Sequence, residues 1–532
     1  MNKVATYLNE HLSGEVVVDS QSITAHATDR SQLLVQPEMV AHVASTSDIR
    51  KIMRFCWQLA EKGHTLSVTA RGSGENTTGA SIGGGIIVSL SRYMNHVVGI
   101  DPKQRLIHIQ SGAMQSGAKM VLSTHSGMTL PSTSYTECDG TVGGGIASGA
   151  AGYLVSRYGR FGDSAKQLEV VLANGDVLQT NRLTKRDVNA KKGLHTFEGE
   201  IYRQIDNLIA DNKTLIDSLE VTTSGYSGIA KVKKKDGSMD LTPLFIGSEG
   251  TLGIVSEVIL QAQFARKNVH IVVSAYETLS DAHVAADSAA NLKATAIELI
   301  DGRILKRAAT QGKKKEFAPE ASYSGGLLIV VFDDFSERNR QRLAKKLEKE
   351  LAKTPGHIKT TSLSTADALA TDIHALLALA NHSQTATGLV PGAFSGLWLP
   401  SAQVSAYIDE LKKAEKELSV ELPVFIDVTS GRVDILPVFD LKKVTDRQKM
   451  LRALSVVADL IHKHSGALAG YGGEGRLKSL VTYGTLHEAE ANLYQQIKTI
   501  FDPHGILNPG VKQKVAAKDI ALQLNAWCRD AA

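Results

Sequence analysis

The stretch from Pro131 to Gly175 reads PSTSYTECDGTVGGGIASGAAGYLVSRYGRFGDSAKQLEVVLANG. It places a run of glycine and alanine between a proline and a strand-like segment, Leu168 to Leu172. Residues this small expose main chain and cannot fill a hydrophobic core, so another body must lie against them. We predict that this body is a flat, extended cofactor that carries phosphate groups.

A second glycine-rich loop, Arg71 to Gly79, lies upstream and reads RGSGENTTG. It follows Thr65 to Ala70, whose alternating apolar residues predict a half-buried strand. The first glycines of the loop let main-chain N–H groups converge on an anion, and its serine, asparagine and threonine side chains add neutral donors. The loop is therefore a candidate phosphate cradle.

Three interpretations of this loop compete. A dinucleotide-binding turn needs a third glycine where Thr77 stands and a helix directly afterwards, whereas Ile86 to Leu90 reads as a strand. A P-loop needs a lysine where Ala80 stands. A glycine-rich hairpin without a ligand stays open on the loop alone. The presence of two such loops in one segment of chain favours a cofactor that spans both.

The composition is that of an ordinary globular protein. The chain has 532 residues, enough for two or three domains, with 43% hydrophobic and 21% charged residues. Its net charge of +4 supports neither nucleic-acid nor membrane binding. The three cysteines, Cys56, Cys138 and Cys528, are too few and too scattered for a disulfide framework or a metal cluster. We expect a reducing compartment.

The N-terminal sequence MNKVATYLNEHL has neither the apolar segment nor the cleavage site of a signal peptide. Nowhere does a run of about 18 apolar residues predict a membrane span. We therefore expect a cytoplasmic protein, with peripheral contact with a membrane left open.

A series of motifs follows in order along the chain: RGSGEN at Arg71 to Asn76, TVGGGIA at Thr141 to Ala147, RYG at Arg157 to Gly159, VVLANGD at Val170 to Asp176, GSEGTLGIV at Gly247 to Val255 and FDPHGILNPG at Phe501 to Gly510. Together they resemble the FAD-binding domain of the vanillyl-alcohol oxidase type, also called the PCMH type. The branch that the chain resembles contains D-lactate dehydrogenases, glycolate oxidase flavin subunits and D-2-hydroxyglutarate dehydrogenases.

The resemblance implies an α+β fold in three parts. Residues 1–265 would form a PCMH-type FAD-binding domain of two subdomains, and residues 266–465 a ferredoxin-like α+β cap that holds the substrate. Residues 466–532 would return to the FAD domain. Apolar periodicity supports the cap independently, with strands at Ile271 to Val273 and Gly326 to Phe332 and helices at Ser280 to Leu292 and Arg338 to Lys353.

The resemblance also implies which residues bind the cofactor, FAD. They are Arg71, Gly72, Ser73, Gly74, Glu75, Asn76, Thr77, Pro131, Thr141, Gly144, Gly145, Ala147, Ser148, Tyr158, Gly159, Asp163, Glu249, Gly253, Ile254 and Asn508. FAD would lie extended, with its pyrophosphate at one glycine-rich loop and its ring system near the other.

The expected substrate site departs from the family pattern. Dehydrogenases of this branch carry a hairpin with two histidines that can hold a divalent metal against the substrate. The matching segment, Ile426 to Asp434, has Asp427 and Asp434 at the histidine positions and Arg432 at an asparagine position. We interpret the aspartates as surface carboxylates that pair with Arg432, and we predict no metal ligand. The alternative that the two aspartates bind a hard cation, Mg or Ca rather than Zn, stays open. Trp398 could line an apolar pocket or belong to the core.

A second catalytic motif of the branch matches Gly470 to Arg476, where Tyr471 replaces an acid and Gly472 replaces the catalytic histidine. Oxidation of an alcohol by a flavin needs a group that handles the hydroxyl proton. Our candidate catalytic residues are Tyr471, as hydrogen-bond donor or base, and Arg476 and Arg432, as bidentate holders of an anionic substrate.

Two functions remain open. In the first, the chain is an FAD-dependent dehydrogenase or oxidase that takes a hydride from a D-lactate-like 2-hydroxy acid, or a related alcohol, to flavin N5. A quinone, a cytochrome or another acceptor would reoxidise it. In the second, the chain is an FAD-binding partner subunit that has lost this chemistry. Neither involves nucleic acid, and the oligomeric state is open.

Overall fold

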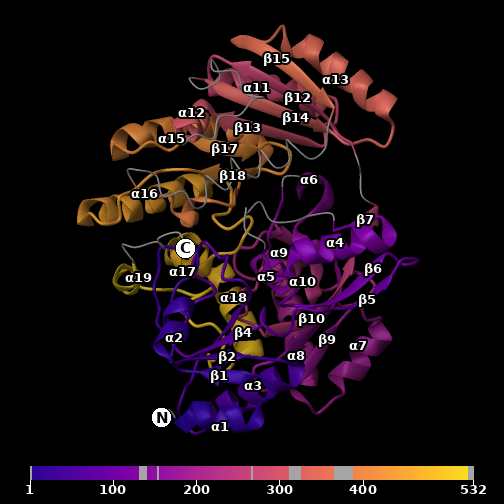
Figure 1. Cartoon of the computed structure of the whole chain (residues 1–532), viewed down its shortest axis with the longest axis vertical. Coiled ribbons are helices and arrows are strands. Elements are labelled where there is room, and N and C mark those ends of the chain that lie inside the picture. The colour runs from indigo at the N-terminus through magenta and orange to yellow at the C-terminus, as the bar shows by residue number, and fades with distance from the viewer. Residues whose placement is uncertain are drawn as a thin grey trace.

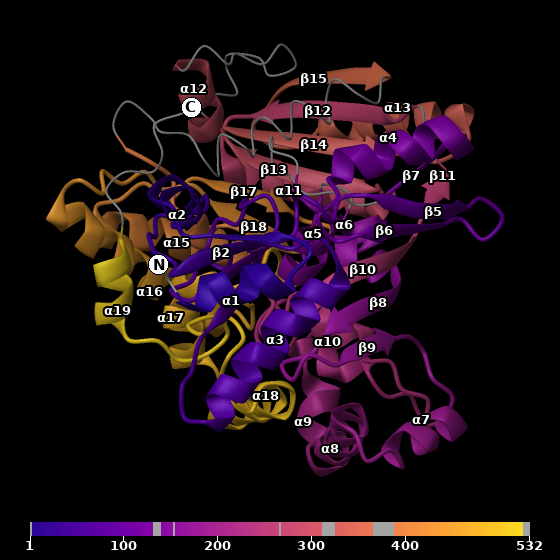
Figure 2. The same ribbon diagram turned by 60° about the horizontal axis from the view of Figure 1, so that its bottom comes forward.

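The computed structural model describes residues 3–130, 140–152, 155–264, 268–310, 325–364 and 388–524. The chain forms a lower lobe from its first half and an upper lobe from the residues that follow (Figure 1). Its last helices, drawn in yellow, return to the lower lobe, as both ribbon views show (Figures 1 and 2). The mixture of helices and separate sheets confirms the expected α+β class.

The first part of the lower lobe is built on a four-stranded sheet in the order β1-β2-β4-β3. Strands β2 and β3 both run parallel to β4, and α3 makes the crossover between β2 and β3. Buried apolar side chains from α1, α3 and the sheet form its core. The elements are α1 (Lys3–His11), β1 (Glu15–Val17), α2 (Ser20–His26), β2 (Met39–His42), α3 (Thr46–Glu61), β3 (Val68–Arg71) and β4 (Ile86–Ser89).

The second part of the lower lobe has a five-stranded antiparallel sheet in the order β5-β6-β10-β8-β9. Its strands are β5 (Val97–Asp101), β6 (Leu106–Gln110), β8 (Ala165–Val171), β9 (Val177–Thr180) and β10 (Ile254–Gln261), and β7 (Met128–Thr129) pairs with β11 (Gln263–Phe264). The helices are α4 (Gln115–Ser126), α5 (Val142–Ser148), α6 (Val155–Tyr158), α7 (Lys185–Lys192), α8 (Phe197–Asp211), α9 (Lys213–Ser218) and α10 (Thr242–Phe245). Short 3-10 turns cover Phe161–Ser164 and Ser227–Lys231.

The upper lobe, or cap, is a seven-stranded antiparallel sheet in the order β15-β12-β14-β13-β17-β18-β16. The strands are β12 (His270–Tyr276), β13 (Ala296–Asp301), β14 (Gly326–Phe332), β15 (His357–Ser364), β16 (Leu397–Trp398), β17 (Val424–Asp427) and β18 (Arg432–Ile435). The helices are α11 (Leu279–Asn291), α12 (Gly302–Thr310), α13 (Glu337–Leu351), α15 (Val404–Leu418) and α16 (Val444–Lys463). Short 3-10 turns cover Gly392–Phe394 and Ser401–Gln403.

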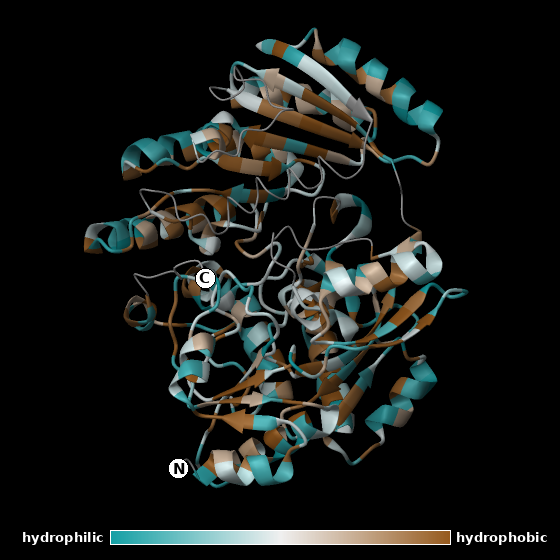
Figure 3. Ribbon diagram, viewed as in Figure 1, coloured by the Kyte–Doolittle hydropathy of each residue, from teal (hydrophilic) through white to brown (hydrophobic). Residues whose placement is uncertain are grey.

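Hydropathy explains the layering of the cap. Every residue of β14 is buried, and helices α11, α13, α15 and α16 contribute apolar residues to a core on one face of the sheet. Figure 3 shows apolar strands inside and a mostly hydrophilic α13 on the outer surface. The two helices and two strands that periodicity predicted here are confirmed as α11, α13, β12 and β14. None of the helices in the described ranges has the length and apolarity that a membrane crossing requires.

The C-terminal segment binds the lower lobe through main chain and through the buried side chain of Lys498. It contains α17 (Gly475–Thr485), α18 (Glu488–Phe501) and α19 (Ala517–Gln523). In the loop after α18, Leu507 forms a parallel bridge with Val68, the first residue of β3. Lys498 Nζ donates to Asp502 Oδ2 at 2.6 Å and to the carbonyl of Thr251 at 2.7 Å. The hydrogen bond to Thr251 joins α18 to the segment that precedes β10.

We expect that Lys498→Met destabilises the lower lobe by about 3 to 5 kcal/mol, because it leaves the buried Asp502 carboxylate without its counterion. The urea midpoint of unfolding, followed by tryptophan fluorescence, measures the effect. Lys213→Met removes an exposed ion pair to Asp217 and should change the free energy of unfolding by less than about 1 kcal/mol. Equal midpoints for the two variants would contradict this role of Lys498.

Candidate functional site

The two glycine-rich segments meet between the two sheets of the lower lobe. A Cβ atom on Gly72, just after β3, would lie 2.1 Å from Oγ1 of Thr141, so the approach requires glycine. Thr141 caps α5, because its Oγ1 accepts a hydrogen bond from Gly144 N at 3.1 Å. The side chain of Asn76 folds back on its own loop and accepts hydrogen bonds from the N–H groups of Thr78 and Ala80.

These segments border two adjoining clefts with volumes of about 950 and 660 Å³. The larger cleft extends from the loops to the cap, where Ser395, Gly396 and Arg432 line it. The smaller cleft extends toward the start of β10. The residues that line both are Gly72, Asn76, Ser81, Thr141, Gly144 and Ser148. The shared wall makes the two clefts one elongated hollow.

Most of the residues that the sequence assigned to the cofactor line this hollow. They are Arg71, Gly72, Ser73, Gly74, Glu75, Asn76, Thr77, Thr141, Gly144, Gly145, Ala147, Ser148, Glu249, Gly253 and Ile254.

Four of the expected cofactor residues lie elsewhere, and one is not described. The hydroxyl of Tyr158 donates to Asp333 of the cap at 3.1 Å. Gly159 and Asp163 border a separate cleft, which Tyr471 and Trp398 also line. Asn508 lies behind the wall of the hollow. Pro131 falls outside the described residues, as does Cys138.

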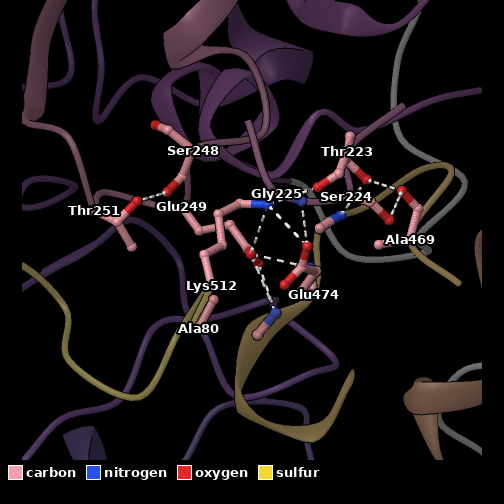
Figure 4. Close-up of polar contacts among 12 residues, drawn as sticks. Ala80, Thr223, Ser224, Gly225, Ser248, Glu249, Thr251, Ala469, Glu474 and Lys512 are labelled. Atoms are coloured by element: carbon pink, nitrogen blue, oxygen red, sulfur yellow. Dashed lines mark hydrogen bonds and ion pairs between the residues drawn. The ribbon is translucent and has the colours of Figure 1, made fainter. Parts of the chain in front are cut away.

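A buried ionic network lies beside the smaller cleft (Figure 4). The carboxylate of Glu249 accepts hydrogen bonds from the N–H groups of Glu474 at 2.9 Å and Gly475 at 3.0 Å. Lys512 Nζ lies 3.8 Å from Glu249 Oε2 and 3.6 Å from Glu474 Oε1, and donates to the carbonyl of Thr223 at 2.6 Å. The network joins the GSEGTLGIV motif to the divergent motif that ends at Arg476 and to the C-terminal segment.

The Glu249 carboxyl group titrates near neutral pH in this environment. Burial raises its pKa to about 7, the charge of Glu474 adds to the rise, and the charge of Lys512 opposes it. The residue has a φ of 54°, a conformation that residues other than glycine rarely adopt. Surrounding contacts therefore hold Glu249 in one strained position.

Arg476 and Asn508 brace the back of the first glycine-rich loop. The guanidinium of Arg476 donates to the carbonyls of Gly79 at 2.5 Å and Pro509 at 2.9 Å. Asn508 Nδ2 donates to the carbonyls of Ala80 at 2.8 Å and Glu249 at 2.7 Å. Burial lowers the pKa of Arg476 to about 10. Arg476 lines neither cleft, and main-chain carbonyls behind the cleft accept hydrogen bonds from its guanidinium, so this placement does not support the prediction that Arg476 holds a substrate.

The hairpin of β17 and β18 differs from the expected surface hairpin. Asp427 and Asp434 are 0% and 1% exposed, so neither is a surface carboxylate. Arg432 does pair with Asp434, at 2.8 Å between Nε and Oδ2, and also donates to the carbonyl of Ala151 in the lower lobe. Asp427 instead accepts hydrogen bonds from the N–H of Thr429 and the hydroxyl of Ser430, because it lies where β17 enters the turn.

Tyr471 lies in the wall between the larger cleft and the separate cleft near Asp163. Its hydroxyl donates to the carbonyl of Ser430 in the cap hairpin at 3.0 Å. Burial raises the pKa of this phenol above its ordinary value, so the hydroxyl keeps its proton at neutral pH. The structure therefore favours Tyr471 as a hydrogen-bond donor over Tyr471 as a base.

Sequence analysis missed Lys478, which lines the larger cleft on the first turns of α17. The side chain is 1% exposed, and its ammonium donates to the carbonyl of Ser395 in the cap. Burial lowers its pKa to about 8. A lysine two residues after Arg476 carries no signal of burial in the sequence, since most lysines are exposed. Its place depends on how α17 packs beneath the cap.

The lining of the hollow suits FAD. Glycines leave main chain exposed along the larger cleft, and serine and threonine side chains there provide neutral donors for phosphate oxygens. Ala70, Leu90, Ile254 and Val255 give the smaller cleft an apolar wall for a flat ring. When bound, FAD accepts a hydride from a substrate. In the described part of the chain, no three His, Cys, Asp or Glu side chains are grouped as a metal site would require.

Two protein-family models match the chain. Residues 37–181 match the FAD binding domain, and residues 265–511 match the C-terminal domain of FAD linked oxidases. The chain belongs to the FAD-linked oxidases. Its cofactor is therefore FAD, and the cap of this family member corresponds to most of the second matched segment.

Curated relatives cover nearly the whole chain at low identity. The D-2-hydroxyglutarate dehydrogenase of Pantoea ananatis is 26% identical over 96% of this chain and 52% of its own length. The D-lactate dehydrogenase of Anaerostipes hadrus is 24% identical over 89% of each chain. The chain spans about half the length of the D-2-hydroxyglutarate dehydrogenases that it matches.

A solved structure shares the fold across both lobes. The 4-ethylphenol oxidase from Gulosibacter chungangensis superposes with a TM-score of 0.69 over 97% of each chain, at 15% sequence identity. This match places the chain in the PCMH-type fold that the sequence motifs indicated.

We expect that Gly72→Ala lowers the FAD content of the purified protein at least about tenfold, because the new Cβ would collide with Thr141 and separate the two loops. Flavin absorbance after heat denaturation, divided by protein concentration, measures the content. Gly84→Ala is the control, since a Cβ there meets no atom within 4 Å. A Gly72→Ala protein with full FAD content would show that the loops need not touch.

We expect a pH-dependent contribution of Glu249 to stability. Its pKa of about 7 in the folded protein exceeds the ordinary value of 4.5. Between pH 4.5 and pH 7, the folded state therefore keeps a proton that the unfolded state has released. The free energy of unfolding therefore falls as pH rises from about 4.5 to 7.

In Glu249→Gln this contribution should disappear, so its urea midpoint should change less than that of the wild-type protein between pH 5 and pH 8. Glu10→Gln, at an exposed position, should follow the wild-type profile. Parallel profiles for Glu249→Gln and the wild type would contradict the protonation of Glu249.

Proposed function

We propose that this protein is an FAD-dependent dehydrogenase that oxidises a 2-hydroxy acid to the 2-oxo acid. The substrate would give a hydride from its hydroxyl-bearing carbon to flavin N5, and a separate acceptor, such as a quinone or a cytochrome, would take the electrons onward. A D-lactate-like acid is the substrate that we propose first, because relatives over most of the chain are named for D-lactate and D-2-hydroxyglutarate.

One observation carries the proposal. The cleft that begins at the cofactor loops continues to residues of both divergent motifs, Arg432 and Tyr471. A small molecule that enters at the cap would therefore meet these side chains in the same hollow as the cofactor. If the cap residues only packed against the lower lobe, they would fill this space, and the cleft would end at the cofactor loops.

The two residues can take different parts in the reaction. Arg432 shapes the cap end of the cleft, because Asp434 balances its charge and, with the carbonyl of Ala151, holds its guanidinium in place. Tyr471 keeps its proton and donates it in a hydrogen bond to the carbonyl of Ser430, so its oxygen is suited to accept a hydrogen bond from a substrate hydroxyl. Arg476 supports the reaction only indirectly, through the loop that it braces.

The partner-subunit alternative rests on one feature. Gly472 occupies the position of the catalytic histidine, and it also lines the larger cleft, so no side chain reaches into the hollow from that position. A protein that binds FAD and a partner without oxidising a substrate would tolerate this loss.

Anaerobic mixing of the FAD-loaded protein with D-2-hydroxy acids distinguishes the two functions. We expect D-lactate or a longer D-2-hydroxy acid to bleach the visible flavin band, while the L-enantiomers, as matched controls, reduce it more slowly. If dithionite bleaches the flavin and no hydroxy acid in the panel does, the dehydrogenase proposal is wrong and the partner-subunit function gains support.

A further inference from the structure

We propose that the ammonium group of Lys478 binds the carboxylate of an anionic substrate at the cap end of the larger cleft. The inference rests on the proposed function and names the chemistry that would hold the substrate there. In the cap, the carbonyl of Ser395 accepts a hydrogen bond from this ammonium group.

The position of Lys478 is unusual for a lysine. Its side chain is 1% exposed, yet it lines the larger cleft. Its hydrogen bond to Ser395 uses one of three N–H donors. A buried ammonium is costly unless anions or other acceptors surround it. A ligand oxygen in the cleft can accept from the remaining donors.

The carboxylates near Lys478 have other hydrogen-bond or ion-pair partners. Asp434 accepts two hydrogen bonds from Arg432 and a third from the N–H of Gly396. Glu249 and Glu474 lie against Lys512. Among the described residues, none of these carboxylates forms an ion pair with Lys478.

The charges along the larger cleft therefore do not balance. The charged residues that line it are Glu75, Arg432 and Lys478. Glu75 pairs with Arg30, and Arg432 pairs with Asp434, so each of these pairs is neutral. Lys478 leaves one positive charge in the lining. One negative charge on a ligand, as on a 2-hydroxy monocarboxylate, would neutralise it.

The divergent hairpin is consistent with a clamp of this kind. Two aspartates stand at the family's histidine positions. Asp427 accepts hydrogen bonds from Thr429 and Ser430, and Asp434 forms an ion pair with Arg432. Hydrogen bonds within the hairpin therefore hold the oxygens of both carboxylates. Of the two cations in the lining, Arg432 is paired with Asp434, whereas Lys478 forms no ion pair with a described residue.

A reduced flavin also carries one negative charge, so two anions could use Lys478. The test separates them with two probes on the FAD-loaded protein. Oxamate, a monoanion that does not react, reports the carboxylate site through its perturbation of the flavin spectrum. Sulfite, which adds to flavin N5, reports positive charge close to the flavin itself.

We expect that Lys478→Met weakens oxamate binding at pH 7 at least about tenfold, because a charged hydrogen bond is lost. Lys478→Arg should keep most of the affinity, and sulfite affinity should change less than oxamate affinity. Lys213→Met, which removes an exposed lysine, should bind oxamate as the wild type does. If Lys478→Met does not retain FAD, Lys478→Gln is used, since its amide can still donate to Ser395.

Unchanged oxamate affinity in Lys478→Met or Lys478→Gln would overturn the proposal. So would a loss of sulfite affinity with oxamate affinity intact, which would assign Lys478 to the flavin. Oxamate binding does not require turnover. Lysine-dependent oxamate binding without bleaching by any hydroxy acid would therefore reject the dehydrogenase function and keep the carboxylate site.

Discussion

The buried carboxylate of Glu249 is the contact on which the site depends. It accepts hydrogen bonds from two successive N–H groups where α17 begins, and it does so from a strained main-chain position that its own loop must maintain. The start of α17 is thereby fixed to the lower lobe. Because Tyr471 precedes this point and Lys478 follows it, both side chains take their positions in the cleft from this contact.

Helix α17 connects three parts of the molecule that are far apart in sequence. Arg476 on its first turn holds the first glycine-rich loop against the C-terminal segment, and Lys478, one half-turn later, contacts the cap through Ser395. Cap, cofactor loops and C-terminus therefore meet at one short stretch of chain. A family member can alter its substrate chemistry within this stretch while the cofactor hollow keeps its shape, since the hollow is lined mostly by glycine, serine and threonine.

The divergent motifs changed the chemistry of the site in a consistent direction. Where the family pattern has histidines, this chain has two aspartates that hydrogen bonds and an ion pair tie into the hairpin, and a glycine that opens space. The polar groups that remain toward the cleft are a protonated phenol, a paired guanidinium and an ammonium. Of these groups, the ammonium has no paired carboxylate among the described residues and can stabilise negative charge, which agrees with an anionic substrate more directly than with a neutral alcohol.

The glycine motifs in the sequence carried the resemblance that implied the α+β fold and FAD, and most of the residues assigned to FAD on that basis line the hollow. Such motifs act locally, because a glycine permits a close approach wherever its loop is placed. Tertiary structure alone decided the roles of charged residues. Arg476 and Lys478 lie two positions apart in the sequence, yet one braces a loop behind the cleft and the other lines it. The role of a charged side chain depends on its burial and on the partners that the fold brings to it. Neither can be predicted from the residues next to it in the sequence.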